Sequence, residues 1–563
     1  MFDKRTIIAL SASMSILGIG IGVGVYFGLT MGKKPKGGER RFTSMESPLI
    51  YFSKDDALDI TWYHRANRKI QYQEALTGSY MMVSADVILG THAPSGKTNI
   101  PVIAYGGANS SDLSLDEWLD GILVKKKGVK LNMGHIDAIE PSLKLLRNKE
   151  DLIDQPVWIN GIILKGPGSA TTPLDNMGFI KLVHSTFPSC TFSVGWSTTC
   201  CNHGGINRTH VEEMAMAIKY VRQPVSITVP AALLKPSWSE LKWFLGKSDR
   251  FTLTVTTPAG DDDDWQDTSL YDLLYVRNDY DKRTIFYDLP GPKFSQFKKL
   301  VKTAGSILHY FPLSTRDGLE ITWAHAANSK ADMKKALSGN DMMIEADILT
   351  DARGTAIMAH PPQTSSDNTF ETWLTEITKT TKGMKLDFKA TSAVEPCLQL
   401  LQKKKQEIEQ PVWINADILQ GPKGKAPAIN AAEFLNLVKT VFPECTMSLG
   451  WTTGGDYSPS EEAYSQAMVA EMAETCKTLQ QPVTFPVRAI LVRRSWKSLT
   501  WLLNQSRGFS LTIWHSAADR IDVDDLVYIR KNSQIDRVYY DLPDDLMKQL
   551  KTKLNYENYN VRT

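Results

Sequence analysis

The stretch EQPVWINADILQGP, residues 409–422, is a second version of DQPVWINGIILKGP, residues 154–167. The tetrapeptide YDLP likewise occurs twice, at 287–290 and at 540–543. Self-similarity of this kind is the signature of an internal repeat. The sequence therefore predicts two tandem units, at residues 49–290 and 308–543, joined by a linker at 291–307 and followed by a C-terminal tail at 544–563.

Each unit consists of short apolar segments separated by amphipathic segments with helical periodicity. This alternation is typical of a (β/α)8 barrel, so we expect an α/β fold with two tandem TIM-like barrels. The connection between the second and third apolar segments is too short for a helix, which makes one crossover unusual. The eight strands predicted for the second unit are EITWAH (320–325), MMIEADIL (342–349), AIMAH (356–360), MKLDF (384–388), PVWINADIL (411–419), TMSLGW (446–451), VTFPVRAIL (483–491) and FSLTIW (509–514).

The composition is that of an ordinary globular protein. Apolar residues make up 42% and charged residues 22% of the 563 residues, which excludes broad disorder. A net charge of +2 gives no electrostatic case for a nucleic-acid partner. Six cysteines are too few for a disulfide scaffold in a chain of this length.

The amino end carries a long uncharged stretch at residues 7–31. It exceeds the roughly 20 residues that a helix needs to cross a bilayer. A cleaved signal peptide would have a shorter apolar run and a small-residue cleavage site, which VYFGLTMGKK does not offer. We therefore expect an uncleaved transmembrane helix at 7–31, followed by a juxtamembrane linker at 32–48, with the membrane as a partner.

Two features of the sequence bear on the orientation of this anchor, and they favour opposite sides of the membrane. Basic residues are more numerous after the span than before it, which favours a cytoplasmic location for the bulk of the chain. Three N-x-S/T sequons, at Asn109, Asn207 and Asn504, would be glycan sites in a lumenal domain. We expect a single-pass membrane glycoprotein whose bulk is extracellular or lumenal.

Polar residues gather at the carboxyl ends of the strands predicted in the second unit. In a barrel these ends open into one shared mouth, where active sites are built. Three carboxylates in such a mouth would repel one another unless a cation lay among them, and an all-oxygen set suits Mg²⁺ or Ca²⁺. The candidate site residues are His325, Glu345, Asp347, His360, Asp387, Lys389, Asn415, Asp417, Arg488 and Trp514.

Paired histidines add acid–base chemistry to the predicted cation site. His325 and His360 are suited to general base and general acid roles, because the ordinary histidine pKa is close to working pH. Lys389, beside the cation, would neutralise charge on a phosphoryl oxygen. Together these groups indicate cleavage of a phosphodiester. Asn415, Asp417, Arg488 and Trp514 would contact the substrate.

These motifs resemble the PLC-like phosphodiesterase superfamily, which includes glycerophosphodiester phosphodiesterases and spider-venom phospholipase D enzymes. The resemblance lies in HAAN from residue 325, EAD at 345–347, His360, and DFK at 387–389. It implies a barrel in which His325 and His360 form the acid–base pair, Lys389 contacts phosphate, and Glu345, Asp347 and Asp387 bind a divalent cation. Glycerophosphodiesterases usually continue the first histidine as His-Arg-Gly, whereas this chain has Ala326 and Ala327.

The first unit lacks most of this set. His64 and Asp86 match His325 and Asp347, but the other positions have changed. With two carboxylates and one histidine gone, we expect no cation and no catalysis there, so that the first unit is a pseudoenzyme domain. The four replacements are Ser84 for Glu345, Tyr105 for His360, Asn132 for Asp387 and Gly134 for Lys389.

Over both units, the repeated VWIN, GW and YDLP motifs also resemble the menorin family, in particular its duplicated, membrane-anchored vertebrate branch. Menorin acts outside cells as a recognition cue in neuronal patterning. The resemblance therefore implies an extracellular recognition or adhesion protein with a cell-surface protein partner, and it implies no catalysis. Two functions stay open: a metal-dependent phosphodiesterase acting on glycerophosphodiesters or lysophospholipids, and a non-catalytic recognition protein.

Overall fold

A computed structural model describes residues 46–198, 204–257, 269–455, 457 and 463–560. The predicted transmembrane helix at 7–31 and nearly all of the linker at 32–48 lie outside these residues. Within the described part of the chain, no helix combines the length and the apolar character that crossing a membrane requires.

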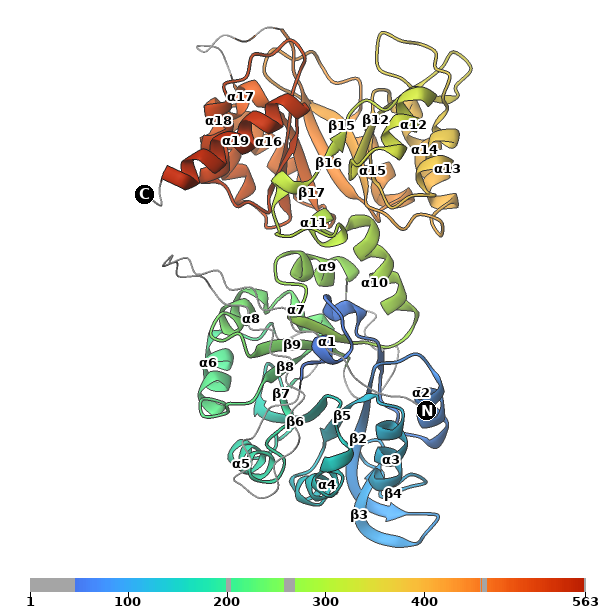
Figure 1. The fold of residues 1–563 in the computed structure, drawn as a ribbon, viewed down its shortest axis with the longest axis vertical. Coiled ribbons are helices and arrows are strands. Elements are labelled where there is room, and N and C mark those ends of the chain that lie inside the picture. Colours follow the sequence, from blue (N-terminus) through green and yellow to red (C-terminus); the bar gives the residue numbers. More distant parts are fainter. Residues whose placement is uncertain (1–45, 199–203, 258–268, 456, 458–462, 561–563) are drawn as a thin grey trace, which may run out of the picture. The chain divides into compact units, whose positions relative to one another are not determined.

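The first unit is a barrel of eight parallel strands, each paired with the next along the chain (Figure 1). Two further strands, β3 (Lys97–Ile103) and β4 (Ser110–Ser111), pair with β2 outside this path. The barrel strands are β1 (Trp62–Tyr63), β2 (Met82–His92), β5 (Gly128–Met133), β6 (Val157–Lys165), β7 (Thr191–Ser197), β8 (Val225–Pro230), β9 (Phe251–Thr256) and β10 (Ile285–Asp288).

The second unit repeats this architecture. One extra strand, β13 (Ala356–Met358), pairs only with β12, and it runs antiparallel to it. The barrel strands are β11 (Trp323–Ala324), β12 (Met343–Thr350), β14 (Gly383–Phe388), β15 (Val412–Gln420), β16 (Thr446–Thr452), β17 (Val483–Arg488), β18 (Phe509–Trp514) and β19 (Val538–Asp541). The prediction of two tandem TIM-like barrels is thus confirmed.

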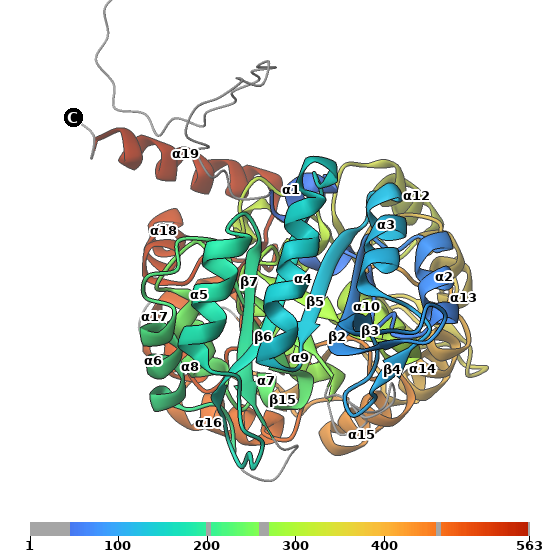
Figure 2. The same cartoon turned by 90° about the horizontal axis from the view of Figure 1, so that it is seen from below.

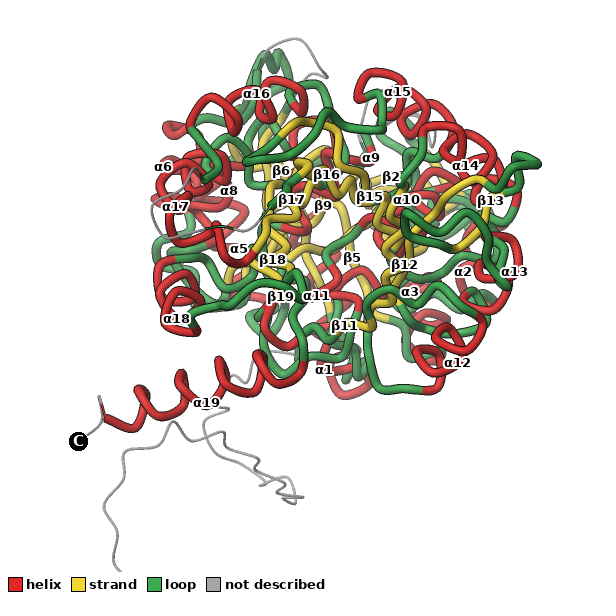
Figure 3. Tube along the Cα trace, turned by 90° about the horizontal axis from the view of Figure 1, so that it is seen from above, coloured by secondary structure: helices red, strands yellow, loops and turns green. Residues whose placement is uncertain are grey.

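Helices form the outer layer of each barrel, and the strands form its centre (Figures 2 and 3). In the first barrel and the linker they are α1 (Pro48–Tyr51), α2 (Lys69–Thr77), α3 (Leu115–Val124), α4 (Ile136–Asn148), α5 (Asn176–Thr186), α6 (Arg208–Ala217), α7 (Ala231–Leu234), α8 (Trp238–Leu245), α9 (Leu270–Asn278) and α10 (Gly291–Ala304). In the second they are α11 (Ile307–Tyr310), α12 (Lys330–Ser338), α13 (Phe370–Ile377), α14 (Val394–Lys403), α15 (Ala431–Val441), α16 (Gln466–Cys476), α17 (Ala489–Leu503), α18 (Val523–Asn532) and α19 (Asp544–Asn560).

One strand of the second barrel was wrongly predicted. The AIMAH segment does not form the third barrel strand, because β13 folds back on β12 as a hairpin. A hairpin needs only a short connection, which explains why the segment before AIMAH is too short to contain a crossover helix. The eighth barrel strand is β19, which leads into the second YDLP motif. Arg488 therefore ends the sixth barrel strand and Trp514 the seventh.

Aromatic side chains pack in the same way in both barrels. Trp158 of β6 contacts the Trp62 ring edge-on with 5.4 Å between centroids, and Trp413 of β15 contacts Trp323 at the same distance. Only 1% of Trp158 and 2% of Trp413 is exposed to solvent. The repeated VWIN motif therefore stabilises the barrel by burying large apolar surface.

A buried charge cluster joins the first and last strands of the first barrel. Asp288, at the end of β10, accepts from Lys130 Nζ at 2.9 Å and lies 2.8 Å from Nδ1 of His64, which follows β1. Burial opposes ionisation of this carboxyl, but Lys130 and His64 outweigh it and hold the Asp288 pKa well below its usual range. The charged carboxylate therefore stabilises the fold at neutral pH, and this stabilisation is lost as the pH falls through the lowered pKa.

We predict that Asp288→Asn destabilises the first barrel by about 3–5 kcal/mol, because it leaves the buried Lys130 ammonium without its counter-charge. Chemical denaturation measures this as a lower transition midpoint. The matched control is Asp154→Asn, whose carboxylate pairs with Lys126 at the surface and should contribute less than about 1 kcal/mol. Equal midpoints for the two variants would contradict the role assigned to the cluster.

Candidate active site

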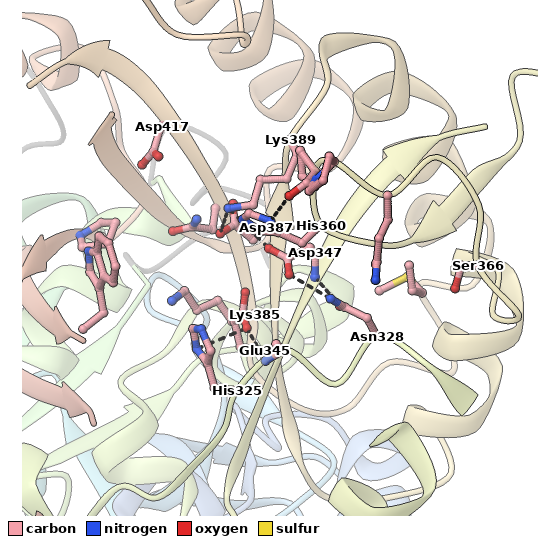
Figure 4. A pocket seen from close by; sticks show the side chains of 18 of the residues that line it. His325, Asn328, Glu345, Asp347, His360, Ser366, Lys385, Asp387, Lys389 and Asp417 are labelled. Atoms are coloured by element: carbon pink, nitrogen blue, oxygen red, sulfur yellow. Dashed lines mark hydrogen bonds and ion pairs between the residues drawn. The ribbon is translucent and has the colours of Figure 1, made fainter. Parts of the chain in front are cut away.

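A cavity of about 1540 Å³ opens at the carboxyl ends of the second barrel's strands. Of the ten site residues predicted in this barrel, nine line the cavity, and Arg488 does not. Figure 4 shows the side chains that converge there from β12, β14 and the loops that follow the strands. The sequence therefore located the site, and the geometry below shows how its members are held.

The three predicted ligand carboxylates lie together. Glu345 and Asp347 are two residues apart on β12, and Asp347 is the register partner of Asp387 on β14. One oxygen from each of the three lies within 4.8 Å of the others. Glu345 is 1% and Asp347 4% exposed. Such close packing of buried carboxylates is unfavourable without a compensating cation.

One oxygen of the Asp387 carboxylate is a candidate cation ligand. Its Oδ1 atom is buried and has no hydrogen-bond partner among the described residues, whereas its Oδ2 accepts from Lys389 Nζ at 2.7 Å. A buried carboxylate oxygen without a partner is costly. The donor set, three carboxylates with one oxygen unsatisfied, fits a hard divalent cation such as Mg²⁺ or Ca²⁺.

Glu345 and Asp347 are oriented by the segment that follows β11. Ala326 donates its backbone N–H to Glu345 Oε2 at 2.7 Å. Asn328 donates Nδ2–H to Asp347 Oδ2 at 2.9 Å and accepts from the Asp347 backbone N–H at 2.8 Å. Burial, assisted by the Asp347 charge, raises the pKa of Glu345 to about 7 against the opposing effect of His325. The HAAN motif thus positions carboxylates as well as supplying a histidine.

His325 lies between two carboxylates. Its Nδ1 is 3.3 Å from Glu345 Oε2 and 3.4 Å from Asp541 Oδ2, and about half of its side chain, 55%, is exposed. The Glu345 charge, with a contribution from Asp541, raises the pKa of His325 to about 9. His360 is exposed and follows β13, with Nδ1 2.7 Å from the Pro361 carbonyl oxygen. Both histidines lie beside the carboxylate group (Figure 4).

Lys389 spans two of the carboxylates. Its Nζ is 2.7 Å from Asp387 Oδ2 and 3.3 Å from Asp347 Oδ1. Burial alone would lower the Lys389 pKa, but the two carboxylates outweigh it and raise the pKa. The lysine therefore carries its charge within the carboxylate cluster.

The four residues predicted to contact substrate differ in their surroundings. Asp417 lies within the cavity wall, where burial followed by the Asp387 charge raises its pKa to about 7. Gly450 makes room for it, since a Cβ at that position would lie 2.3 Å from Asp417 Oδ1. Arg488 is held by Asp519, with Nε 2.7 Å from Oδ2. The predicted substrate contact by Arg488 stays a prediction, and Asn415 and Trp514 line the cavity.

Three residues of the site were not predicted. Lys385 of β14 is 3% exposed and lies 3.3 Å from Asp541 Oδ2, and Asp541 in turn contacts His325. Asn328 holds Asp347. All three residues recur in the first unit, as Lys130, Asp288 and Asn67, and this recurrence could have drawn attention to them. A residue that recurs in both units is more simply explained by packing than by a polar role in the site.

The first barrel satisfies the corresponding groups internally. Ser84 Oγ accepts from the Arg65 backbone N–H at 2.9 Å, which replaces the Glu345 contact. Asp86 accepts from Asn132 at 2.7 Å and from Asn67 at 2.9 Å, and the Arg65 guanidinium lies 3.7 Å away. Among the described residues, the side chains that are grouped closely enough to hold a metal ion lie in the second barrel.

The three sequon asparagines, Asn109, Asn207 and Asn504, are exposed. Asn207 also caps α6, where its side-chain oxygen accepts from the His210 backbone N–H at 3.2 Å. Its amide nitrogen stays available for a glycan.

The model of the Menorin N-terminal domain matches this chain twice, over residues 56–293 and 317–547. The chain belongs to the menorin family. Its curated relatives include human Protein FAM151B, which is 50% identical over 245 residues, covering 42% of this chain and 89% of that protein. Each menorin match coincides with one barrel, in agreement with the sequence-based assignment.

Solved structures share less with this menorin-family chain. A glycerophosphoryl diester phosphodiesterase from Parabacteroides distasonis is 12% identical, with a TM-score of 0.30, covering 45% of this chain and 93% of that chain. A Prevotella bryantii endo-beta-mannanase/endo-beta-glucanase is 9% identical, with a TM-score of 0.31, covering 90% of this chain and 96% of that chain. These low scores carry no argument about function, and the fold rests on the strand order above.

We predict that His325 titrates near pH 9 in the metal-free chain, because Glu345 stabilises its imidazolium. NMR of isotope-labelled histidine measures the pKa, and Glu345→Gln should lower it by at least about one unit. Since the folded pKa of His325 is raised above its unfolded value, protonation of His325 contributes stability that is lost as the pH rises through about 9. Titration of the wild type near 6.5 would contradict the pairing.

Proposed function

We propose that the second barrel is a metal-dependent phosphodiesterase, with Mg²⁺ or Ca²⁺ held by Glu345, Asp347 and Asp387. The observation that carries this proposal is the unsatisfied, buried Oδ1 of Asp387 within a cluster of three carboxylates. The first barrel supports it by contrast, because there the protein's own amides and Arg65 surround the one surviving carboxylate.

The chemistry requires a proton acceptor, a proton donor and stabilisation of charge on phosphorus. The bound cation would supply Lewis-acid stabilisation of the phosphoryl oxygens. His325 and His360 form the acid–base pair: one takes the proton from the attacking hydroxyl as the new P–O bond forms, and the other protonates the alcohol oxygen as the old P–O bond breaks. Lys389 neutralises negative charge on a non-bridging oxygen.

The substrate class that suits this set is a glycerophosphodiester or lysophospholipid. The cavity is large enough for such a head group. The predicted anchor at 7–31 would hold the barrel close to a lipid surface. Asn415, Asp417 and Trp514 offer hydrogen-bonding and apolar contacts for the leaving group.

A second candidate function is non-catalytic recognition at the cell surface. Membership of the menorin family favours it. Under this proposal the cavity of the second barrel is inherited, and a cell-surface protein is the partner. The two functions differ in whether the carboxylate cluster is needed.

Hydrolysis by the full-length chain decides between them. We predict turnover of glycerophosphodiesters or lysophospholipids in the presence of Mg²⁺ or Ca²⁺ and loss of turnover on chelation. Glu345→Gln and His325→Ala should each lower kcat/KM by at least about 10²-fold. Asp86→Asn, which alters the carboxylate that the first barrel retains, should leave kcat/KM unchanged. Activity that survives chelation or Glu345→Gln would overturn the proposal.

The bulk of the chain is proposed to be extracellular or lumenal. The three exposed sequons support this proposal. We predict that the chain from a eukaryotic cell gains mobility on a gel after treatment with peptide N-glycosidase, and that replacing Asn109, Asn207 and Asn504 with Gln abolishes the shift. A wild-type chain without any shift would contradict this orientation.

A further inference from the structure

Two further lysines line the cavity. Lys423 and Lys425 belong to the loop that follows β15, and both contribute to the cavity wall. Lys425 is exposed and makes no ion pair with any residue that the structure describes. Lys389, by contrast, is already engaged by Asp387 and Asp347. The loop therefore adds positive charge that the carboxylate cluster does not use.

This loop is fixed against the loop that follows β16. Lys423 and Thr453 form an antiparallel bridge, and Thr452 Oγ1 donates to the Lys425 carbonyl at 2.5 Å. Gly424 permits the close approach, since a Cβ there would lie 2.2 Å from the Thr452 carbonyl oxygen. The two lysines are thus presented from a loop that is hydrogen-bonded to its neighbour in the cavity wall.

The backbone of Lys423 is in a conformation that glycine prefers. Its φ is +51°, in the left-handed region, whereas the corresponding residue of the first barrel is Gly168 with φ +66°. A residue with a Cβ pays for this conformation in free energy, and such strain concentrates at functional sites. The second barrel therefore keeps a lysine where the fold itself favours glycine.

The first barrel carries neither lysine. Gly168 and Ala170 of GPGSATTP stand where the second barrel has Lys423 and Lys425 in GPKGKAP. The barrel that has lost the carboxylate cluster thus also lacks these charges. The two lysines therefore occur in the barrel that has the carboxylate cluster, and the barrel fold does not require them.

We propose that Lys423 and Lys425 form a second anion subsite, and that the substrate is a phosphodiester with an additional phosphate monoester or carboxylate on its head group. This inference rests on the proposed phosphodiesterase function and names its substrate class. An ammonium group binds phosphate and carboxylate alike as a compact point charge. The scissile phosphate would lie beside Lys389 and the cation that the carboxylates would hold, and the second anion would lie at the loop after β15.

Matched substrates test the subsite in the full-length chain with Mg²⁺. One pair is glycerophosphoinositol and glycerophosphoinositol 4-phosphate, which differ by one phosphate. The other is glycerophosphoethanolamine and glycerophosphoserine, which differ by one carboxylate. In at least one pair, we expect the member with the additional anion to have a kcat/KM about 10-fold higher. Which pair shows the preference identifies the anion.

The double variant Lys423→Gln/Lys425→Gln should abolish this preference and leave kcat/KM for the substrates without the additional anion within about twofold of the wild-type value. Lys403→Gln/Lys404→Gln, outside the cavity, is the control. Calorimetric binding of the same pairs to His360→Ala provides a readout that needs no turnover. Equal affinity within both pairs, or a preference that survives the double variant, would overturn the subsite. A binding preference without any wild-type turnover would instead support the subsite and overturn the phosphodiesterase proposal.

Discussion

The buried aspartate at the end of the last strand is the group on which each barrel depends. Asp288 and Asp541 each contact a buried lysine of the third barrel strand and the histidine that follows the first strand. Side chains of this cluster therefore connect the last strand of each barrel with the segment that follows the first strand. Because the aspartate is buried, its charge stabilises the barrel only while the lysine and the histidine are present to compensate it.

The two barrels use this cluster differently. In the first, His64 is only 4% exposed and lies 2.8 Å from Asp288, so that it is a structural residue. In the second, the corresponding His325 lies 3.3 Å from Glu345 and 3.4 Å from Asp541, and it is half-exposed and lines the cavity. The same position therefore holds a buried structural histidine in one barrel and a cavity-lining histidine in the other.

Much of this arrangement follows from the sequence, and the misses have physical causes. Repeated strands and helical segments predicted both barrels, and residue types at strand ends predicted the carboxylate cluster. AIMAH was assigned to the barrel because alternation does not distinguish a hairpin strand from a parallel one. The polar roles of Lys385 and Asp541 depend on contacts between residues 156 positions apart, and the pairing of Arg488 with Asp519 depends on a loop conformation. Sequence patterns contain none of these contacts.

We propose that the second barrel holds a cation where the first uses its own amide and guanidinium groups. Crystals of the full-length chain soaked in Mn²⁺, as a probe for Mg²⁺ or Ca²⁺, test it through the anomalous signal of the metal. We expect one peak among Glu345, Asp347 and Asp387, with Asp387 Oδ1 as a ligand, and none beside Asp86. An empty carboxylate cluster at saturating Mn²⁺, or an equal peak beside Asp86, would contradict it.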